Sequence, residues 1–258
     1  FFLHAHAGIR DPLWSRGLGD VYKRQMSCFT QIILLKGTYK MFSLKKTFSL
    51  IHKEGWKFAT IFFLTSSLLL MVWLPFAIIG FLLTFFVVWF FRDPDRKTPN
   101  IKNKIISPAD GKICLIDKAK PPKELLMDSK DMFRICVFMN VFNVHVNRSP
   151  VKGTIREIVY KKGQFLNASL DKASEKNERN SLIIETDDNK EIIVTQIAGL
   201  IARRILSFVS NKDKIDVGER FGLIRFGSRV DIYLPEGSKA AVKIGDTVKA
   251  GETIIGSL

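Results

Sequence analysis

A run of 34 residues without a charge, residues 58–91, is the feature that most limits how this chain can fold. As one continuous helix it would be about 51 Å long, well beyond the hydrocarbon core of a bilayer, which is about 30 Å thick. Pro75 lies near its centre, where proline removes a helix hydrogen bond and clashes with the preceding turn. The run therefore predicts a hairpin of two helices, 58–74 and 76–91. Each is about 25 Å long, short but usable as a membrane span.

Basic residues flank this run on both sides. They are Lys45, Lys46, Lys53 and Lys57 before it and Arg92, Arg96 and Lys97 after it. By the positive-inside rule both ends lie in the cytoplasm, which requires a hairpin. Trp56 and Trp89 then mark one membrane interface and Trp73 the other. We expect a segment at 41–91 that anchors the chain in the cell (inner) membrane, with the soluble part on the cytoplasmic face. A buried core hairpin, one tilted span and a re-entrant loop are the alternatives.

The first forty residues are expected to lie outside the fold. Residues 1–25 show no sustained period of a helix or a strand, and they lack the apolar region and cleavage site of a signal peptide. Either they form a disordered extension, or they are translated sequence that is not part of the natural protein, and we favour the second reading. Met26 and Met41 are both candidate starts, and Met41 opens the better-organised stretch.

The net charge of +15 points to a partner class. Acidic residues are interspersed with the basic ones throughout, so neither half is a polybasic tail, and no nucleic-acid partner is expected. A positive excess beside an apolar segment fits an anionic lipid surface better. The three cysteines form no CxxC pair, which argues against a disulfide scaffold or a structural zinc site.

Residues 92–258 are predicted to form a mainly β domain. Residues 93–100 (DPDRKTPN) have the composition of a linker, and 133–146 is apolar on both faces, as in a central strand. Two further runs, 181–185 and 191–196, flank a turn signal. The end, 241–256, resembles half of a lipoyl or biotinyl carrier barrel. The expected fold is α+β: a barrel-like or sandwich-like β domain with lipoyl-like C-terminal hairpins, behind an N-terminal helical membrane hairpin.

Three residues of this domain are candidates for catalysis. His145 is its only histidine, Asp110 lies in SPADGKI, and Ser228 follows Gly227 between two strand-like runs. Taken singly they predict a structural histidine, a plain turn and a bend. Together they supply a carboxylate that orients an imidazole and an imidazole that deprotonates a hydroxyl. The chain has no GxSxG elbow, Walker loop, dinucleotide fingerprint or HExxH motif.

Five segments carry a resemblance to a known family. They are, in order, SPADGKI, NVHVNRSPVKG, FLNASLDKASEKNERN, TQIAGLIARRI and GLIRFGSRVDIYLP. This order is similar to that of the short-form phosphatidylserine decarboxylases, and the resemblance covers residues 41–258, including the apolar run. Members of that family are made as precursors that cut themselves before a serine, which becomes a pyruvoyl group.

The resemblance implies a cut between Gly227 and Ser228, with His145, oriented by Asp110, removing the proton of Ser228. It also implies that the pyruvoyl group, covalent and derived from Ser228, forms a Schiff base with phosphatidylserine, which leaves as phosphatidylethanolamine and CO₂. No metal and no pyridoxal phosphate are expected. The implied partners are phosphatidylserine in an anionic membrane and the two cleaved chains, α and β, as a heterodimer that itself forms a homodimer.

Several readings stay open at this point. Arg229 either binds the carboxylate or phosphate of the substrate or forms a structural ion pair. The alternative function is a membrane-tethered, non-enzymatic carrier or adaptor with a lipoyl-like domain, and a third is a membrane serine hydrolase that uses Ser228 uncut. The expected division of the chain is an extension at 1–40, an anchor at 41–91 and a self-cleaved decarboxylase domain at 92–258.

Overall fold

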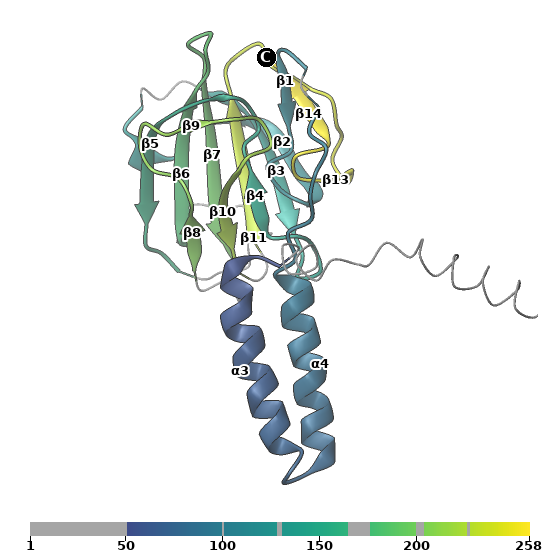
Figure 1. Cartoon of the computed structure of the whole chain (residues 1–258). Coiled ribbons are helices and arrows are strands. Elements are labelled where there is room, and N and C mark those ends of the chain that lie inside the picture. Colours follow the sequence, from purple (N-terminus) through teal and green to yellow (C-terminus); the bar gives the residue numbers. More distant parts are fainter. Residues whose placement is uncertain (1–50, 100, 128–130, 165–175, 200–203, 226–227) are drawn as a thin grey trace, which may run out of the picture. The chain divides into compact units, whose positions relative to one another are not determined.

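The structure, a computed structural model, describes residues 51–99, 101–127, 131–164, 176–199, 204–225 and 228–258. The expected extension at 1–40, the start of the expected anchor at 41–50 and Gly227 lie outside these residues. The described part consists of two helices followed by a mainly β domain (Figure 1). The mainly β architecture with two preceding helices is confirmed.

The two helices, α3 (Lys53–Leu69) and α4 (Leu74–Phe90), form the hairpin predicted from the uncharged run. Pro75 lies in the first turn of α4. Backbone N–H groups in the first turn have no acceptor within the helix, so proline, which lacks an N–H, is tolerated there and starts the second helix. The arms approach closely at Gly80, where a Cβ atom would lie 2.3 Å from Oγ of Ser66. Two membrane spans were expected, but among the described residues we find no helix whose length and apolar character suffice to cross a membrane.

The β domain is built from short strands and one 3₁₀ turn, η1 (Lys123–Leu125). The strands are β1 (Lys104–Ile106), β2 (Gly111–Ala119), β3 (Met132–Met139), β4 (Val146–Arg148), β5 (Gly153–Lys161), β6 (Arg179–Glu185), β7 (Glu191–Ala198), β8 (Ile205–Ser207), β9 (Lys214–Ile215), β10 (Arg220–Ile224), β11 (Ser228–Leu234), β12 (Lys239–Ala240), β13 (Thr247–Val248) and β14 (Ile254–Ser257).

These strands form one large sheet and two small ones. The large sheet has the order β13-β2-β3-β11-β7-β6-β5-β9, and the small ones are β4-β10-β8 and β1-β14-β12. Strand β11 therefore lies in the interior of the large sheet, antiparallel to β3 on one side and β7 on the other. Because β10 belongs to a small sheet and β11 to the large one, the chain passes from one sheet to the other between Ile224 and Ser228.

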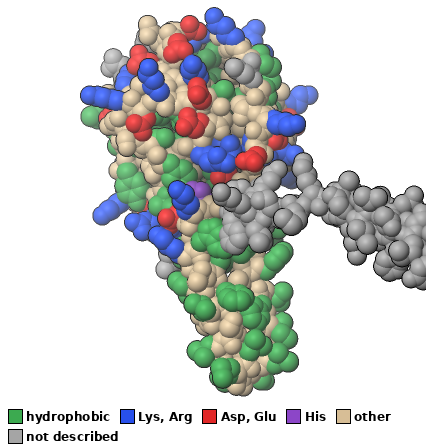
Figure 2. Space-filling view, viewed as in Figure 1, with side chains coloured by type: hydrophobic (Ala, Val, Ile, Leu, Met, Phe, Trp, Pro, Cys, Tyr) green, Lys and Arg blue, Asp and Glu red, His purple; other side chains and the backbone are tan. Residues whose placement is uncertain are grey.

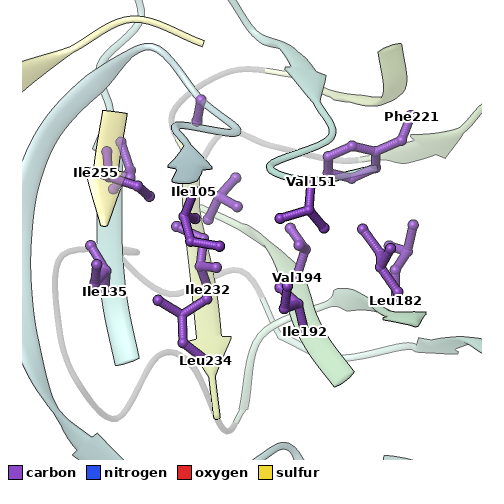
Figure 3. Packing of buried hydrophobic residues seen from close by; sticks show 14 of the residues in the cluster. Ile105, Ile135, Val151, Leu182, Ile192, Val194, Phe221, Ile232, Leu234 and Ile255 are labelled. Carbon is purple, nitrogen blue, oxygen red and sulfur yellow. The ribbon is translucent and has the colours of Figure 1, made fainter. Parts of the chain in front are cut away.

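The main core fills the space between one face of the large sheet and the smaller sheets (Figure 3). Alternate residues of β11, namely Val230, Ile232 and Leu234, point into it, and Ile105 of β1 and Ile255 of β14 meet them. The opposite face of the large sheet is also covered, because Ile183, Ile193 and Tyr233 form a separate buried cluster with Leu125 of η1. Burial on both faces explains why these strands read as continuous apolar runs.

One strand of this domain is shorter than expected. The apolar run 133–146 is not one strand, because β3 ends at Met139 and a turn at 140–143 precedes β4, which begins at Val146: the N–H of Asn140 bonds to Oδ1 of Asn143, and that of Phe142 to Oδ1 of Asn140. The expected linker at 93–100 connects α4 to the β domain without regular secondary structure over its described part, and its start is fixed to the domain, because buried Asp93 pairs with Arg148 at 2.9 Å.

The hairpin also packs against the β domain. Ala59 of α3 and Phe90 of α4 form one buried cluster with Val144, Val146 of β4 and Leu223 of β10. Residues 49–258, which include both the hairpin and the β domain, form one compact unit. The helices are therefore fixed to the sheet β4-β10-β8, which leads directly to the predicted catalytic residues.

Candidate active site

Ser228 occupies the first position of β11, directly after the crossover between the sheets. It lies opposite Met139 of β3 and Ala198 of β7, and its side chain faces the main core with Val230 and Ile232. The residue is fully buried, and its Oγ has no hydrogen-bond partner among the described residues. A buried hydroxyl without a partner costs about 1–3 kcal/mol, and groups left in this state in proteins often have a catalytic role.

His145 is also fully buried and lies between the turn at 140–143 and β4. Its Nδ1 is 3.0 Å from the carbonyl oxygen of Asn143. A carbonyl only accepts, so the proton of the neutral ring is on Nδ1, and Nε2 carries a lone pair. Nε2 is buried and has no partner in the described part of the chain. His145 thus presents an unengaged base.

The surroundings of His145 keep the ring neutral. Its pKa is lowered to about 4, mainly by burial and in addition by the positive charge of Arg92, while the hydrogen bond to Asn143 acts in the opposite direction. The neutral form is the one that removes a proton, so this imidazole is available as a base throughout the physiological range.

A chain of buried amides fixes the strand that carries His145. Asn180 donates to Gln196 at 3.0 Å, and Gln196 donates to Asn147 at 2.8 Å, which ties β4 to β6 and β7 of the large sheet. Asn147 also contacts the sulfur of Met139 at 3.6 Å, and Met139 is the residue opposite Ser228. A second link runs from the N–H of Ile224 to the carbonyl of His145 at 3.3 Å. The structure thereby brings the segments of His145 and Ser228 to the same end of the domain.

Asp110 has other partners. Its carboxylate accepts two bonds from Arg96, at 2.8 and 3.1 Å, and one from the N–H of Ala250 at 2.7 Å. Among the described residues it makes no hydrogen bond to His145, so the group that orients the imidazole here is the carbonyl of Asn143. Arg92 lies within electrostatic range of both Asp110 and His145.

Arg229 points to the opposite face of β11 from Ser228. It is 1% exposed and forms a two-pronged ion pair with Asp231, with both distances 2.8 Å. This geometry matches the structural ion pair, the second of the two roles considered for Arg229. No cluster of three or more potential metal ligands occurs in the ranges that the structure describes.

Reasoning from the sequence missed the residues at the base of the hairpin. Phe90, the last residue of α4, places its ring 4.3 Å from that of His145, between centroids. Arg225 bonds to Glu54 of α3 at 2.9 Å. Phe90 and Glu54 lie in or beside the apolar run, and the membrane interpretation of that run already accounted for them. Their partners, His145 and Arg225, are far away in the chain, so only a structure shows the contacts.

Comparison with known families identifies the family of this chain. A family model described as phosphatidylserine decarboxylase matches residues 83–256, more than half of the chain. The match includes the end of α4, His145 and Ser228. Members of this family characteristically mature from a zymogen and carry a pyruvoyl group. The chain belongs to the phosphatidylserine decarboxylase family, and is thus a carboxy-lyase that converts phosphatidylserine to phosphatidylethanolamine.

Proposed function

We propose that this decarboxylase generates its own pyruvoyl group by cutting the bond between Gly227 and Ser228, with His145 as the base. The observation that carries the proposal concerns two buried atoms at the same end of the domain, Oγ of Ser228 and Nε2 of His145, which have no hydrogen-bond partner among the residues that the structure describes. Buried polar atoms are rarely left without a partner. Deprotonation of the serine requires an acceptor lone pair and a hydroxyl donor, and these two atoms supply them.

The reaction uses only groups of the chain itself and consumes one water molecule. Nε2 of His145 takes the proton of Ser228, and Oγ attacks the carbonyl carbon of Gly227 as the bond from that carbon to the nitrogen of Ser228 breaks; the proton then passes to that nitrogen, which becomes an amine. The resulting ester undergoes β-elimination, in which the proton on Cα of residue 228 is lost, the carboxylate of Gly227 leaves and dehydroalanine remains at 228. Tautomerisation to an imine and hydrolysis by water then give the pyruvoyl group and ammonia.

Ser228 fits as the precursor, since it supplies the three carbons of the group and none of the described residues bonds to its hydroxyl. A pyruvoyl group supplies an electron sink for the electron pair that is released when the carboxylate of the substrate leaves as CO₂. We propose that His145, at the same place, handles the proton that must be returned to the product.

The two products of the cut are proposed to stay together as a heterodimer. The α chain, residues 228–258, would contribute β11, which pairs with β3 and β7 of the other chain along its length. It would also contribute β13, paired with β2, and β14, paired with β1. Because β11 is held on both sides by strands of the other chain, the two chains should separate only when the large sheet unfolds.

We further propose that the hairpin inserts into the membrane that holds the substrate. Large apolar side chains on both helices and at the tip are exposed, among them Met71, Val72 and Trp73 at 85%, 77% and 55%. Figure 2 shows apolar side chains along the hairpin and charged ones over the β domain. Both helices return to the β domain, so the hairpin would enter and leave the bilayer on one face, the cytoplasmic one by its basic flanks. The site at its base would then lie at headgroup level.

The test is the intact mass of the purified chain, first in denaturant and then under native conditions. We expect two pieces that divide before residue 228 in denaturant, with the smaller one lighter by one ammonia than a serine-start peptide and reactive toward hydroxylamine. Under native conditions the two should migrate as one species. The Ser228→Ala variant should stay uncut and inactive. A single uncut mass from a folded wild-type chain in vesicles would refute self-cleavage.

A further inference from the structure

The base of the hairpin contacts the processing site from both arms. On α4, Phe90 is fully buried, and its ring lies 4.3 Å from the ring of His145 at an angle of 34°. Of the aromatic rings in the described residues, Phe90 is the one that packs against this histidine, with the two rings tilted. It closes one side of the imidazole, while the bond from Nδ1 to Asn143 fixes rotation of the ring. The orientation of Nε2 therefore depends on the last turn of α4.

On α3, two residues hold Arg225, which lies three positions before Ser228. Its guanidinium bonds to Oε2 of Glu54 at 2.9 Å and lies 5.1 Å from the ring centre of Phe58. An ion pair and a cation–π contact on the same side chain restrict it strongly. Arg225 begins the segment that passes from β10 to β11 and contains the bond to be cut. Helix α3 thereby fixes the start of that segment.

The arms are locked to each other at this same end. Phe58 of α3 stacks on Phe91 at 5.7 Å, and the N–H of His52 bonds to the carbonyl of Phe91 at 2.8 Å. Gly55 permits the contact, because a Cβ atom there would lie 2.4 Å from Cβ of Phe91. A displacement of one arm would consequently move the other, and with it His145 or Arg225.

We propose that the base of the hairpin is a working part of the self-processing site, in which Phe90 positions His145 and Glu54 positions Arg225, three residues before Ser228. This inference rests on the proposed self-cleavage and extends it to elements whose sequence indicates only membrane attachment. Phe90 and Glu54 are positioning residues, since they act through His145 and Arg225. Cleavage would then be tied to correct seating of the hairpin on the β domain.

The experiment follows cleavage of the full chain after a pulse of cell-free synthesis with vesicles of phosphatidylcholine and phosphatidylglycerol. Phe90→Leu keeps an apolar side chain but removes the ring face, and Glu54→Arg opposes Arg225. Each should slow the appearance of fragment 228–258 by about tenfold or more, since small misplacements of reacting groups have effects of that size. The double variant Glu54→Arg, Arg225→Glu should recover most of the rate, which a merely destabilising change would not.

Matched controls come from the same chain. Phe81→Leu removes an aromatic ring of α4 that contacts Phe63 of α3, away from His145. Glu236→Ala breaks an exposed ion pair with Lys118 beyond the far end of β11. Both should be cut at the wild-type rate. If Phe90→Leu loses the protease-resistant β domain, the Glu54 and Arg225 variants decide the outcome.

The two ways of failing are distinct. An uncut wild-type chain would refute the proposed self-cleavage, and this inference with it. If the wild-type chain is cut, and Phe90→Leu and Glu54→Arg are cut as fast as the controls, this inference alone would be overturned. Slow cleavage of Glu54→Arg without recovery in the double variant would likewise overturn the role given to Glu54.

Discussion

Ser228 differs from the other buried serines of the domain in how its hydroxyl is engaged. Oγ of Ser107 bonds to the carbonyl of Ala109 at 2.7 Å, and Oγ of Ser149 to that of Val151 at 2.6 Å. Such local bonds satisfy a hydroxyl inside a protein. Ser228 begins a strand whose backbone groups face β3 and β7, and it lacks a comparable bond in the part of the chain described. At the scale of single residues, an unsatisfied hydroxyl is what marks Ser228.

The depressed pKa of His145 gives a prediction for the pH dependence of self-cleavage. The neutral imidazole is the active form, so the rate should fall only as the pH drops through about 4. An unperturbed histidine, with a pKa near 6.5, would lose about nine-tenths of its neutral form by pH 5.5. We therefore expect nearly equal cleavage rates at pH 7.5 and pH 5.5, measured after a synthesis pulse and a jump in pH. A large loss of rate at pH 5.5 would show that His145 is more solvated than the structure indicates.

The sequence predicted some of the site and missed the rest for a physical reason. His145 is the only histidine after the apolar run and Ser228 follows a glycine between two strands, so both stand out locally. The ion pair between Glu54 and Arg225 joins residues 171 positions apart. Arg96 and Ala250 both bond to Asp110, although they come from opposite ends of the sequence of the domain. Such pairings depend on topology, which no local pattern encodes.

Among the elements, β11 has the most demanding environment, because it is buried on both faces and carries a buried ion pair. Asp231 is fully buried and pairs with Arg229, and Arg134 lies 4.0 Å away. Removing one partner of a buried pair leaves a charge without compensation, which costs about 3–5 kcal/mol. Replacing both partners by apolar residues of similar size is often neutral. The pair can therefore be tested separately from the reaction.

We expect Asp231→Ala to lower the free energy of unfolding of an uncut Ser228→Ala chain by about 3–5 kcal/mol. The double change Arg229→Met, Asp231→Leu should restore most of it. Urea unfolding in detergent, followed by limited proteolysis, measures both. In the wild-type background the double variant should also be cut and decarboxylate phosphatidylserine. Normal stability with loss of decarboxylation would instead favour contact of Arg229 with the substrate.

Patterns within one element were predicted better than boundaries between elements. The turn between β6 and β7 follows from Asp187, Asp188 and Asn189, and Asn189 has the positive φ of 56° that such a turn favours. The break between β3 and β4 was missed, because its apolar residues continue across the turn. What ends β3 is bonding by the side chains of Asn140 and Asn143, a signal that two asparagines in an apolar run give only weakly.

For the whole molecule, the main consequence is that the apolar hairpin and the β domain form one unit. Its base is buried against β4 and β10, whereas the large side chains toward its tip are exposed. This gradient divides the hairpin into a part that serves the site and a part that is free to meet lipid. Changes at the tip should therefore affect membrane binding without affecting the reaction at the base.

Val72→Asp and Trp73→Asp together should abolish flotation of the chain with phosphatidylcholine and phosphatidylglycerol vesicles, while cleavage before residue 228 continues. A carboxylate deep in a bilayer costs about 2.5–3.5 kcal/mol, so two of them lower the affinity by about three orders of magnitude or more. Ile244→Asp, at a residue of the β domain that is 61% exposed, is the matched control and should float like the wild type. Equal flotation of the tip variant and this control would place the lipid-binding surface elsewhere. Loss of cleavage in the tip variant would instead mean that insertion of the tip, and not only seating of the base, is needed to align Ser228 with His145.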